Sequence, residues 1–96
     1  MTIKEAQELV DALTAKKNIH TNELARMALL TEEIGKLSRV MANRYGNAQG
    51  GKISDHEVSE GIGDIFWSLV GIANQTGTDL TLALTEVLDR NMRKKH

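Results

Sequence analysis

Residues 31–36 read Thr-Glu-Glu-Ile-Gly-Lys, and residues 60–64 read Glu-Gly-Ile-Gly-Asp. Each acidic cluster lies in a long segment whose apolar residues recur at three- and four-residue intervals, which is typical of a helix that buries one face. Carboxylates on such a face are costly to bury unless a cation or hydrogen-bond donors compensate them. In an all-helical chain we therefore expect a divalent metal ion or a basic side chain beside these acids.

The apolar spacing and the capping residues predict four helices and no strand. The main apolar stripe of the second helix, expected to face the core, is Leu24, Met27, Ala28, Ile34, Leu37, Val40 and Met41. The first and third helices are predicted to start at capping boxes, Thr2-Ile3-Lys4-Glu5 and Ser54-Asp55-His56-Glu57. The second is predicted to start at Thr21 or Asn22, and the fourth at Thr78 or Asp79. In chain order, the predicted ends are residues 16–18, Gly46, Gly77 and Met92. Residues 46–54 are rich in glycine and are predicted to form a loop. The short connections after the first and third helices favour antiparallel neighbours. Because the chain has the length of one domain, residues 1–96 are predicted to form a single all-α domain.

The composition is that of an ordinary globular domain and excludes several classes of protein. Hydrophobic residues make up 41% and charged residues 26% of the chain, with no cysteine and a net charge of −1. Disulfides and cysteine-type zinc sites are therefore excluded, and no general attraction to nucleic acid or membrane surfaces is expected. The nearly apolar run 65–73 is too short to span a bilayer. The N-terminus is polar, and we expect a cytoplasmic protein.

The spacing of the acids predicts a metal site but leaves a simpler interpretation open. Acids on the third predicted helix recur at i, i+3 and i+7: Glu57, Glu60 and Asp64. If the second and third helices face each other, Glu33 and Asp64 would meet around a cation, and Mg²⁺ needs one or two protein carboxylates when phosphates supply other oxygens. The alternative is a solvated acidic face with ion pairs to Lys36 or Lys52.

The same residues resemble the motifs of the MazG-like, all-α nucleotide pyrophosphohydrolases, which are related to the dimeric dUTPases. The family pattern is Glu-Glu-x-x-Glu on one helix, Glu-x-x-Asp on the next, and a later Asn-x-x-Lys element. Here the corresponding segments are Glu32-Glu33-Ile34-Gly35-Lys36, Gly61-Ile62-Gly63-Asp64 and Asn91-Met92-Arg93-Lys94. The likeness extends from Glu23 to Lys94, so it covers most of the chain.

The resemblance implies a magnesium site that lacks two of its acids. In the family four carboxylates bind Mg²⁺, and the matching positions here are Glu33, Lys36, Gly61 and Asp64. Only Glu33 and Asp64 can ligate. The two replacements make the site three charges more positive, which opposes cation binding by roughly several kcal/mol at separations of about 4–6 Å. We therefore expect one Mg²⁺ held by Glu33, Asp64 and substrate phosphates rather than a metal cluster.

Two residues are candidates to compensate for the missing acids. Glu60 lies one residue before Gly61 and at i, i+4 from Asp64, so it is a candidate replacement ligand. Lys36 is a candidate substrate-binding residue whose ammonium replaces a metal charge; the alternative is a structural ion pair of Lys36 with Glu32 or Glu33. Glu32 and Glu33 are the candidate catalytic residues, with Glu32 as base or outer ligand.

Three further residues are candidate substrate ligands. Trp67 would stack on a base, although a lone tryptophan is more often packed in a core. Asn91 and Lys94 would hold phosphates, as the resemblance implies; a basic helix end is otherwise explained by the helix dipole. Of the two glycines in the second motif, Gly63 is expected to let another backbone approach closely, and no physical reason for Gly61 is evident beyond loss of the acid.

The resemblance implies a four-helix MazG-like bundle that assembles as a homodimer or a dimer of dimers. It also implies an enzyme that hydrolyses nucleoside triphosphates to monophosphates and pyrophosphate with Mg²⁺. The missing acids keep open a catalytically inactive relative that acts as a nucleotide-binding or structural helical oligomer, and an unrelated helical interaction module is the third alternative. Binding of nucleic acid or membranes is not expected.

Overall fold

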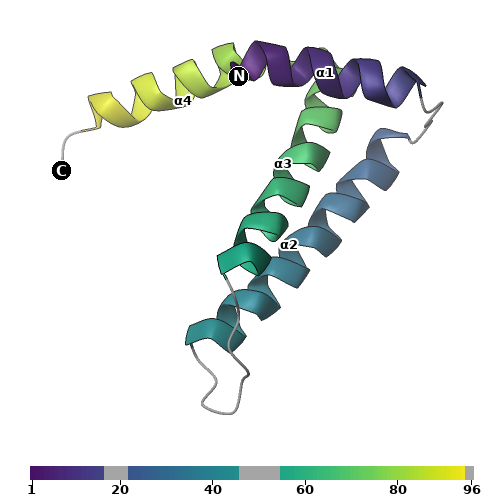
Figure 1. Cartoon of the computed structure of the whole chain (residues 1–96). Helices are drawn as coiled ribbons and strands as arrows, with labels where there is room; N and C mark the ends of the chain where they lie inside the picture. The colour runs from purple at the N-terminus through teal and green to yellow at the C-terminus, as the bar shows by residue number, and fades with distance from the viewer. Residues whose placement is uncertain (17–21, 46–54, 95–96) are drawn as a thin grey trace. The chain divides into compact units, whose positions relative to one another are not determined.

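The computed structural model describes residues 1–16, 22–45 and 55–94, and this part of the chain contains four helices and no strand (Figure 1). The helices are α1 (Ile3–Lys16), α2 (Glu23–Tyr45), α3 (Asp55–Thr76) and α4 (Leu80–Arg93). The all-α prediction is confirmed. The predicted loop 46–54, its Lys52 and the capping residue Ser54 lie outside the described residues. The chain divides into two compact units, Thr21–Leu69 and Met1–His20 with Val70–His96, and each is described by itself.

The helix starts follow from their capping side chains. The Glu5 carboxylate accepts a hydrogen bond from the Thr2 N–H (2.7 Å), and the Thr2 hydroxyl accepts one from the Glu5 N–H (3.0 Å), as predicted for a capping box. Asn22 Oδ1 caps α2 at 2.7 Å, and Asp79 Oδ1 caps α4 at 3.1 Å, each through the amide three residues later. Of the two residues predicted for each start, Asn22 and Asp79 therefore act as caps.

In the unit formed by residues 21–69, α2 and α3 pack side by side and antiparallel (Figure 1). Three contacts fix their register: Glu33 with Ser68, Leu37 with Gly61, and Arg44 with Asp55. As the residue number rises along α2, its partner's number falls along α3. This register places Lys36 opposite the turn of α3 that carries Asp64.

The face of α2 that is buried differs from the face that its apolar residues predict. The buried residues of α2 are Arg26 and Leu30, which are 7% and 8% exposed. Glu33 lies on the same stripe of the helix surface and is half-buried. Leu24, expected on the core face, is 81% exposed, and Met27 is 46% exposed. The prediction of these two as core residues is wrong because the stripe through position 26 faces inward instead.

In the other unit, α1 is fastened to the turn between α3 and α4. Gln7 Nε2 donates to the Thr78 carbonyl (2.9 Å) and to Asn74 Oδ1 (3.2 Å), while Gln7 Oε1 accepts from the Leu80 N–H (3.0 Å). Asn74 Nδ2 returns a bond to the Gln7 carbonyl at 3.1 Å. Gly77, at φ +69°, ends α3 as predicted. The buried apolar residues of this unit are Ala6, Val10, Val70 and Ala73.

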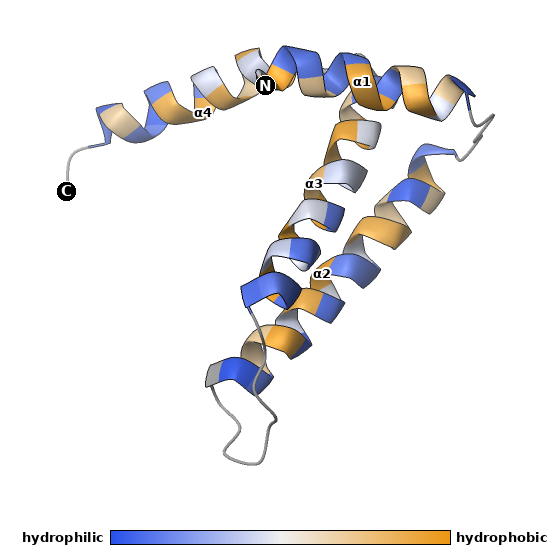
Figure 2. Ribbon diagram, in the orientation of Figure 1, coloured by the Kyte–Doolittle hydropathy of each residue, from blue (hydrophilic) through white to orange (hydrophobic). Residues whose placement is uncertain are grey.

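Helix α4 buries none of its residues. Its large apolar side chains alternate with hydrophilic ones along the ribbon (Figure 2) and remain 40–82% exposed: Leu82, Leu84, Val87, Leu88 and Met92. Within the described ranges, no helix combines the length and the apolar character required to cross a bilayer.

Candidate functional site

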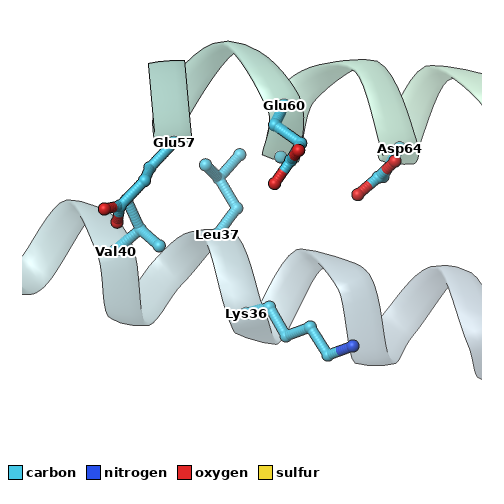
Figure 3. A pocket seen from close by; sticks show the side chains of 7 residues that line it. Lys36, Leu37, Val40, Glu57, Glu60 and Asp64 are labelled. Carbon is cyan, nitrogen blue, oxygen red and sulfur yellow. The ribbon is translucent and has the colours of Figure 1, made fainter. Parts of the chain in front are cut away.

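A cavity of about 320 Å³ lies between α2 and α3. It is lined by Lys36, Leu37 and Val40 from α2 and by Glu57, Glu60, Gly61 and Asp64 from α3. Figure 3 shows the three carboxylates extending from α3 towards α2. With three carboxylates and one ammonium, the lining carries a formal charge of −2. The predicted residues Lys36, Glu60 and Asp64 are thus brought to one pocket.

Lys36 lines the cavity, but its side chain runs along α2 and not towards the three carboxylates (Figure 3). Its Nζ lies 3.6 Å from Glu32 Oε1, one helical turn back, and the two side chains are 62% and 63% exposed. Ion pairs of this kind contribute a few tenths of a kcal/mol in water. Of the predicted alternatives for Lys36, the structure therefore contains the ion pair with Glu32. Because this pair is weak, the ammonium can exchange Glu32 for a bound anion at little cost in free energy.

Glu33 is held one turn beyond Asp64. The Ser68 hydroxyl donates a hydrogen bond to Glu33 Oε1, and Ser68 is 1% exposed. Because Ser68 follows Asp64 by four residues on α3, Glu33 faces the helical turn next to the one that carries Asp64. Glu33 is not among the residues that line the cavity. The predicted pair Glu33 and Asp64 therefore occupies neighbouring turns of the α2–α3 interface.

The two glycines of the second motif differ from the prediction. A Cβ on Gly61 would lie 3.1 Å from Leu37 Cδ1, whereas a Cβ on Gly63 would meet nothing within 4 Å. The expected close approach at Gly63 is therefore wrong within the described chain. At Gly61 a side chain, and not a backbone, lies close, because Leu37 packs where a side chain on residue 61 would begin. This contact supplies the physical reason for Gly61 that the sequence alone does not.

Three further candidate ligands do not line the cavity. Trp67 is 41% exposed on α3 and does not line it. Asn91 Nδ2 donates to the Val87 carbonyl at 2.8 Å, and Lys94 is the C-cap residue of α4. Both belong to the unit that does not contain the cavity. Glu60, in contrast, lines the cavity, and its Oε2 lies 3.9 Å from His56 Nε2.

The donor set favours one hard cation over a metal cluster. Over residues 1–16, 22–45 and 55–94, no three His, Asp or Glu side chains converge in a way that would hold a metal ion. Gly61 offers no ligand, and Lys36 brings a positive charge. Carboxylate oxygens nevertheless suit Mg²⁺, which is commonly held by one or two carboxylates together with substrate phosphates. The residues fit that arrangement and do not fit a site of four carboxylates.

Comparison with known proteins decides the family. The family model described as the MazG nucleotide pyrophosphohydrolase domain matches residues 1–96. The chain belongs to this family. The protein YpjD of Bacillus subtilis, which is named as uncharacterized, is 38% identical over 95 residues, covering 97% of this chain and 82% of its own length. This finding confirms the resemblance inferred from the two acidic motifs.

Two crystal structures are similar along nearly their whole length. The Bacillus-conserved MazG protein, a nucleotide pyrophosphohydrolase, has a TM-score of 0.82 and 30% identity, covering 100% of this chain and 94% of its own. The structure of YpjD from Bacillus subtilis has a TM-score of 0.85 and 35% identity, with 94% of each chain covered. The α2–α3 register also agrees with the motif assignment, since it brings Lys36 opposite Asp64.

Sequence reasoning missed two buried polar side chains of residues 21–69. Ser68 lies within a nearly apolar run and was not identified as a donor, although it binds Glu33. Arg26 is buried without a hydrogen-bond partner for its Nε. A signal for Arg26 exists in the sequence, because Arg26, Leu30, Glu33 and Leu37 are spaced at i, i+4, i+7 and i+11 along one face.

Proposed function

We propose that this chain is a nucleoside triphosphate pyrophosphohydrolase that releases a nucleoside monophosphate and pyrophosphate in an Mg²⁺-dependent reaction. The observation that carries the proposal is the cavity between the two motif-bearing helices, which Lys36 lines from α2 and Glu60 and Asp64 line from α3. Family membership supports the reaction class. The similarity to a crystal structure described as a nucleotide pyrophosphohydrolase points to the same chemistry.

In this proposal Mg²⁺ would be held by Asp64 at the cavity wall and by Glu33 one turn beyond it, together with phosphate oxygens. Glu60 is a further carboxylate at the cavity wall. Bound there, the ion would polarise the phosphate and help to activate water. Lys36 binds a phosphate oxygen in place of Glu32. Glu32 then accepts a proton from the attacking water, whose oxygen bonds to phosphorus as pyrophosphate leaves.

Three further residues remain proposed substrate ligands. Trp67 stacks on the base from the exposed side of α3, as its 41% exposure permits. Asn91 and Lys94 bind phosphate oxygens.

The test is pyrophosphate release from a panel of canonical and modified nucleoside triphosphates with Mg²⁺ or Mn²⁺. Asp64→Ala is expected to abolish release, because it removes a metal ligand without removing a packed core group. Asp11→Asn, at an exposed acid of α1, is the matched control and is expected to retain activity. Absence of turnover on every nucleotide would reject the proposal.

The alternative function is a non-catalytic relative that binds nucleotide without hydrolysing it. Lys36 and Gly61 support it, since each replaces an acid of the family motif. Calorimetry with a non-hydrolysable nucleotide separates the two functions. Nucleotide binding without turnover would favour the non-catalytic relative, and micromolar Mg²⁺ binding in the absence of nucleotide would contradict it.

We also propose that the chain forms a homodimer or a dimer of dimers. The exposed apolar side chains of α4 support this, because a 14-residue helix with no buried residue gains little from packing within its own chain. Sedimentation equilibrium tests the proposal. Leu84→Lys with Leu88→Lys is expected to shift the population to monomer, whereas Arg90→Lys is a control at an exposed polar position of the same helix.

A further inference from the structure

We propose that Ser68 is a positioning residue that sets the metal preference of the site, because it fixes which oxygen of Glu33 can meet a cation. The proposal rests on the proposed function, in which Glu33 is a magnesium ligand. It concerns the discrimination between Mg²⁺ and a larger cation such as Ca²⁺ rather than the bond that is cleaved.

The Ser68 side chain is held in the interior of the unit formed by residues 21–69. It is the one hydroxyl in the nearly apolar run 65–73 and is 1% exposed, so it is shielded from bulk water. Its hydroxyl donates to Oε1 of Glu33 on the facing helix. Breaking this contact would leave a buried hydroxyl without its acceptor, which costs free energy. The contact therefore resists exchange with solvent.

The same contact occupies one oxygen of the Glu33 carboxylate. Over the described ranges of the chain, the Ser68 hydroxyl is the one donor to Glu33. Oε1 is drawn to the buried face of α3, so Oε2 is the oxygen available to a cation. Glu33 is half-buried rather than enclosed, which permits a cation to approach. Because Ser68 follows Asp64 by one helical turn, the contact also fixes the position of Glu33 along α3 relative to Asp64.

Ligation through a single oxygen suits a small cation better than a large one. Mg²⁺ demands near-octahedral geometry at about 2.0–2.1 Å and keeps several waters, so one oxygen from each carboxylate is enough. Ca²⁺ takes roughly 6–8 oxygens at about 2.3–2.6 Å and often uses both oxygens of a carboxylate. Lys36 and Gly61 supply no further carboxylate at the other two motif positions. Holding Oε1 of Glu33 therefore disfavours Ca²⁺ more than Mg²⁺.

The experiment compares the affinities of the full chain for the Mg²⁺ and Ca²⁺ complexes of the same phosphate ligand. Isothermal titration calorimetry is carried out with inorganic triphosphate and with α,β-methylene-ATP, each in millimolar excess of one metal. The wild type should bind the Mg²⁺ complex more tightly than the Ca²⁺ complex. Ser68→Ala should weaken binding of the Mg²⁺ complex by about tenfold, as is typical for groups that orient metal ligands, and binding of the Ca²⁺ complex much less.

The ratio of the two affinities separates positioning from a structural role. A structural loss would weaken both complexes by the same factor and leave the ratio unchanged. Ser59→Ala, at an exposed serine of α3, is the matched control and should not change it. Ser68→Cys keeps the shape of the side chain with a weaker donor. It should shift the ratio in the same direction, which covers the case of a poorly folded Ser68→Ala.

A Glu33→Ala background tests whether Ser68 acts through Glu33. In that background Ser68→Ala should no longer change the ratio of the two affinities, because the carboxylate that it positions is absent. A change of the same size there would reject the proposal. The fold of each variant is checked by circular dichroism.

An unchanged ratio in both Ser68 variants with the fold intact would overturn the proposal. A wild type that binds the Ca²⁺ complexes as tightly as the Mg²⁺ complexes, or that binds neither phosphate, would also overturn it. Pyrophosphate release by the wild type is measured separately. Release with an unchanged ratio would reject this inference and keep the proposed function, and a changed ratio without release would do the reverse.

Discussion

The Ser68 hydroxyl donates a hydrogen bond to the Glu33 carboxylate and thereby joins the buried face of α3 to α2. Ser68 is 1% exposed and Glu33 is half-buried, so a hydroxyl inside the unit compensates an acid on an inward face. Glu33 therefore has a protein donor before any cation arrives. This differs from the initial expectation that a metal ion or a basic side chain would be its partner.

Ser68→Ala is expected to destabilise the chain by about 1–3 kcal/mol, because it removes the donor from a partly buried charged acceptor. The measurement is urea-induced unfolding followed by circular dichroism. Ser59→Ala, at an exposed serine of the same helix, should change the free energy of unfolding by less than about 0.5 kcal/mol. Equal effects of the two substitutions would show that the Ser68 hydroxyl does not stabilise the interface.

Alanine substitutions should separate the two glycines of the second motif. Gly63→Ala is expected to stabilise the chain by about 0.5–1 kcal/mol, since alanine favours the helix and its Cβ meets open space. Gly61→Ala should gain less or lose stability, because Leu37 must move. Thermal unfolding measures both. In a Leu37→Ala background, Gly61→Ala should recover the gain, and an unchanged effect there would contradict the packing argument.

Gln7→Ala should loosen the start of α4. It removes the side-chain bonds to Asn74, to the Thr78 carbonyl and to the Leu80 N–H, and we expect a loss of about 1–3 kcal/mol. Amide hydrogen exchange should accelerate at Leu80. Lys4→Ala on the exposed face of α1 is the control, and similar exchange in the two variants would argue against the role of Gln7.

The N-terminal cap of α1 should weaken in acid. Hydrogen bonds to the backbone N–H and the hydroxyl of Thr2 lower the pKa of Glu5 below its ordinary value. The cap is thus fully stabilising above the ordinary glutamate range and is lost as the pH falls through the lowered pKa. The difference in unfolding free energy between wild type and Glu5→Gln should shrink on acidification through this range. A constant difference would contradict the assignment.

Restoring the two missing acids should create a metal site that is independent of nucleotide. Lys36→Glu with Gly61→Glu supplies the acids, and Leu37→Ala makes room for the new side chain at residue 61. Like-charge crowding should lower the melting temperature in EDTA, and millimolar Mg²⁺ should raise it by binding the native state. A rise no larger than that of the parent would mean that these positions do not face a common site.

Local signals predicted the helices well. Asn22 and Asp79 were among the predicted caps, and Gly77 adopts the positive φ that ends a helix. These caps and helix ends depend on residues a few positions apart or on the period of a single helix, which the sequence displays directly. The family resemblance assigned Lys36 and Asp64 to one site, and both line the cavity.

The contacts that were missed join distant parts of the chain. Ser68 finds Glu33 across 35 positions, and its hydroxyl is hidden in an apolar run. Leu37 reaches Gly61 only because of the α2–α3 register, which no local pattern specifies. Leu24 was expected in the core because it is apolar, whereas the inward face of α2 carries Arg26. Packing therefore overrides composition on this helix.

The unburied face of α4 has a consequence for how the chain responds to dilution. A helix of 14 residues is marginal in water by itself, and α4 contributes no buried residue that would hold it. If a second copy covers Leu84, Val87 and Leu88, amide protection in α4 should fall when the protein is diluted, while protection in α2 changes less. Hydrogen exchange at single amides of α4 would then measure assembly, and the order of this helix would depend on protein concentration.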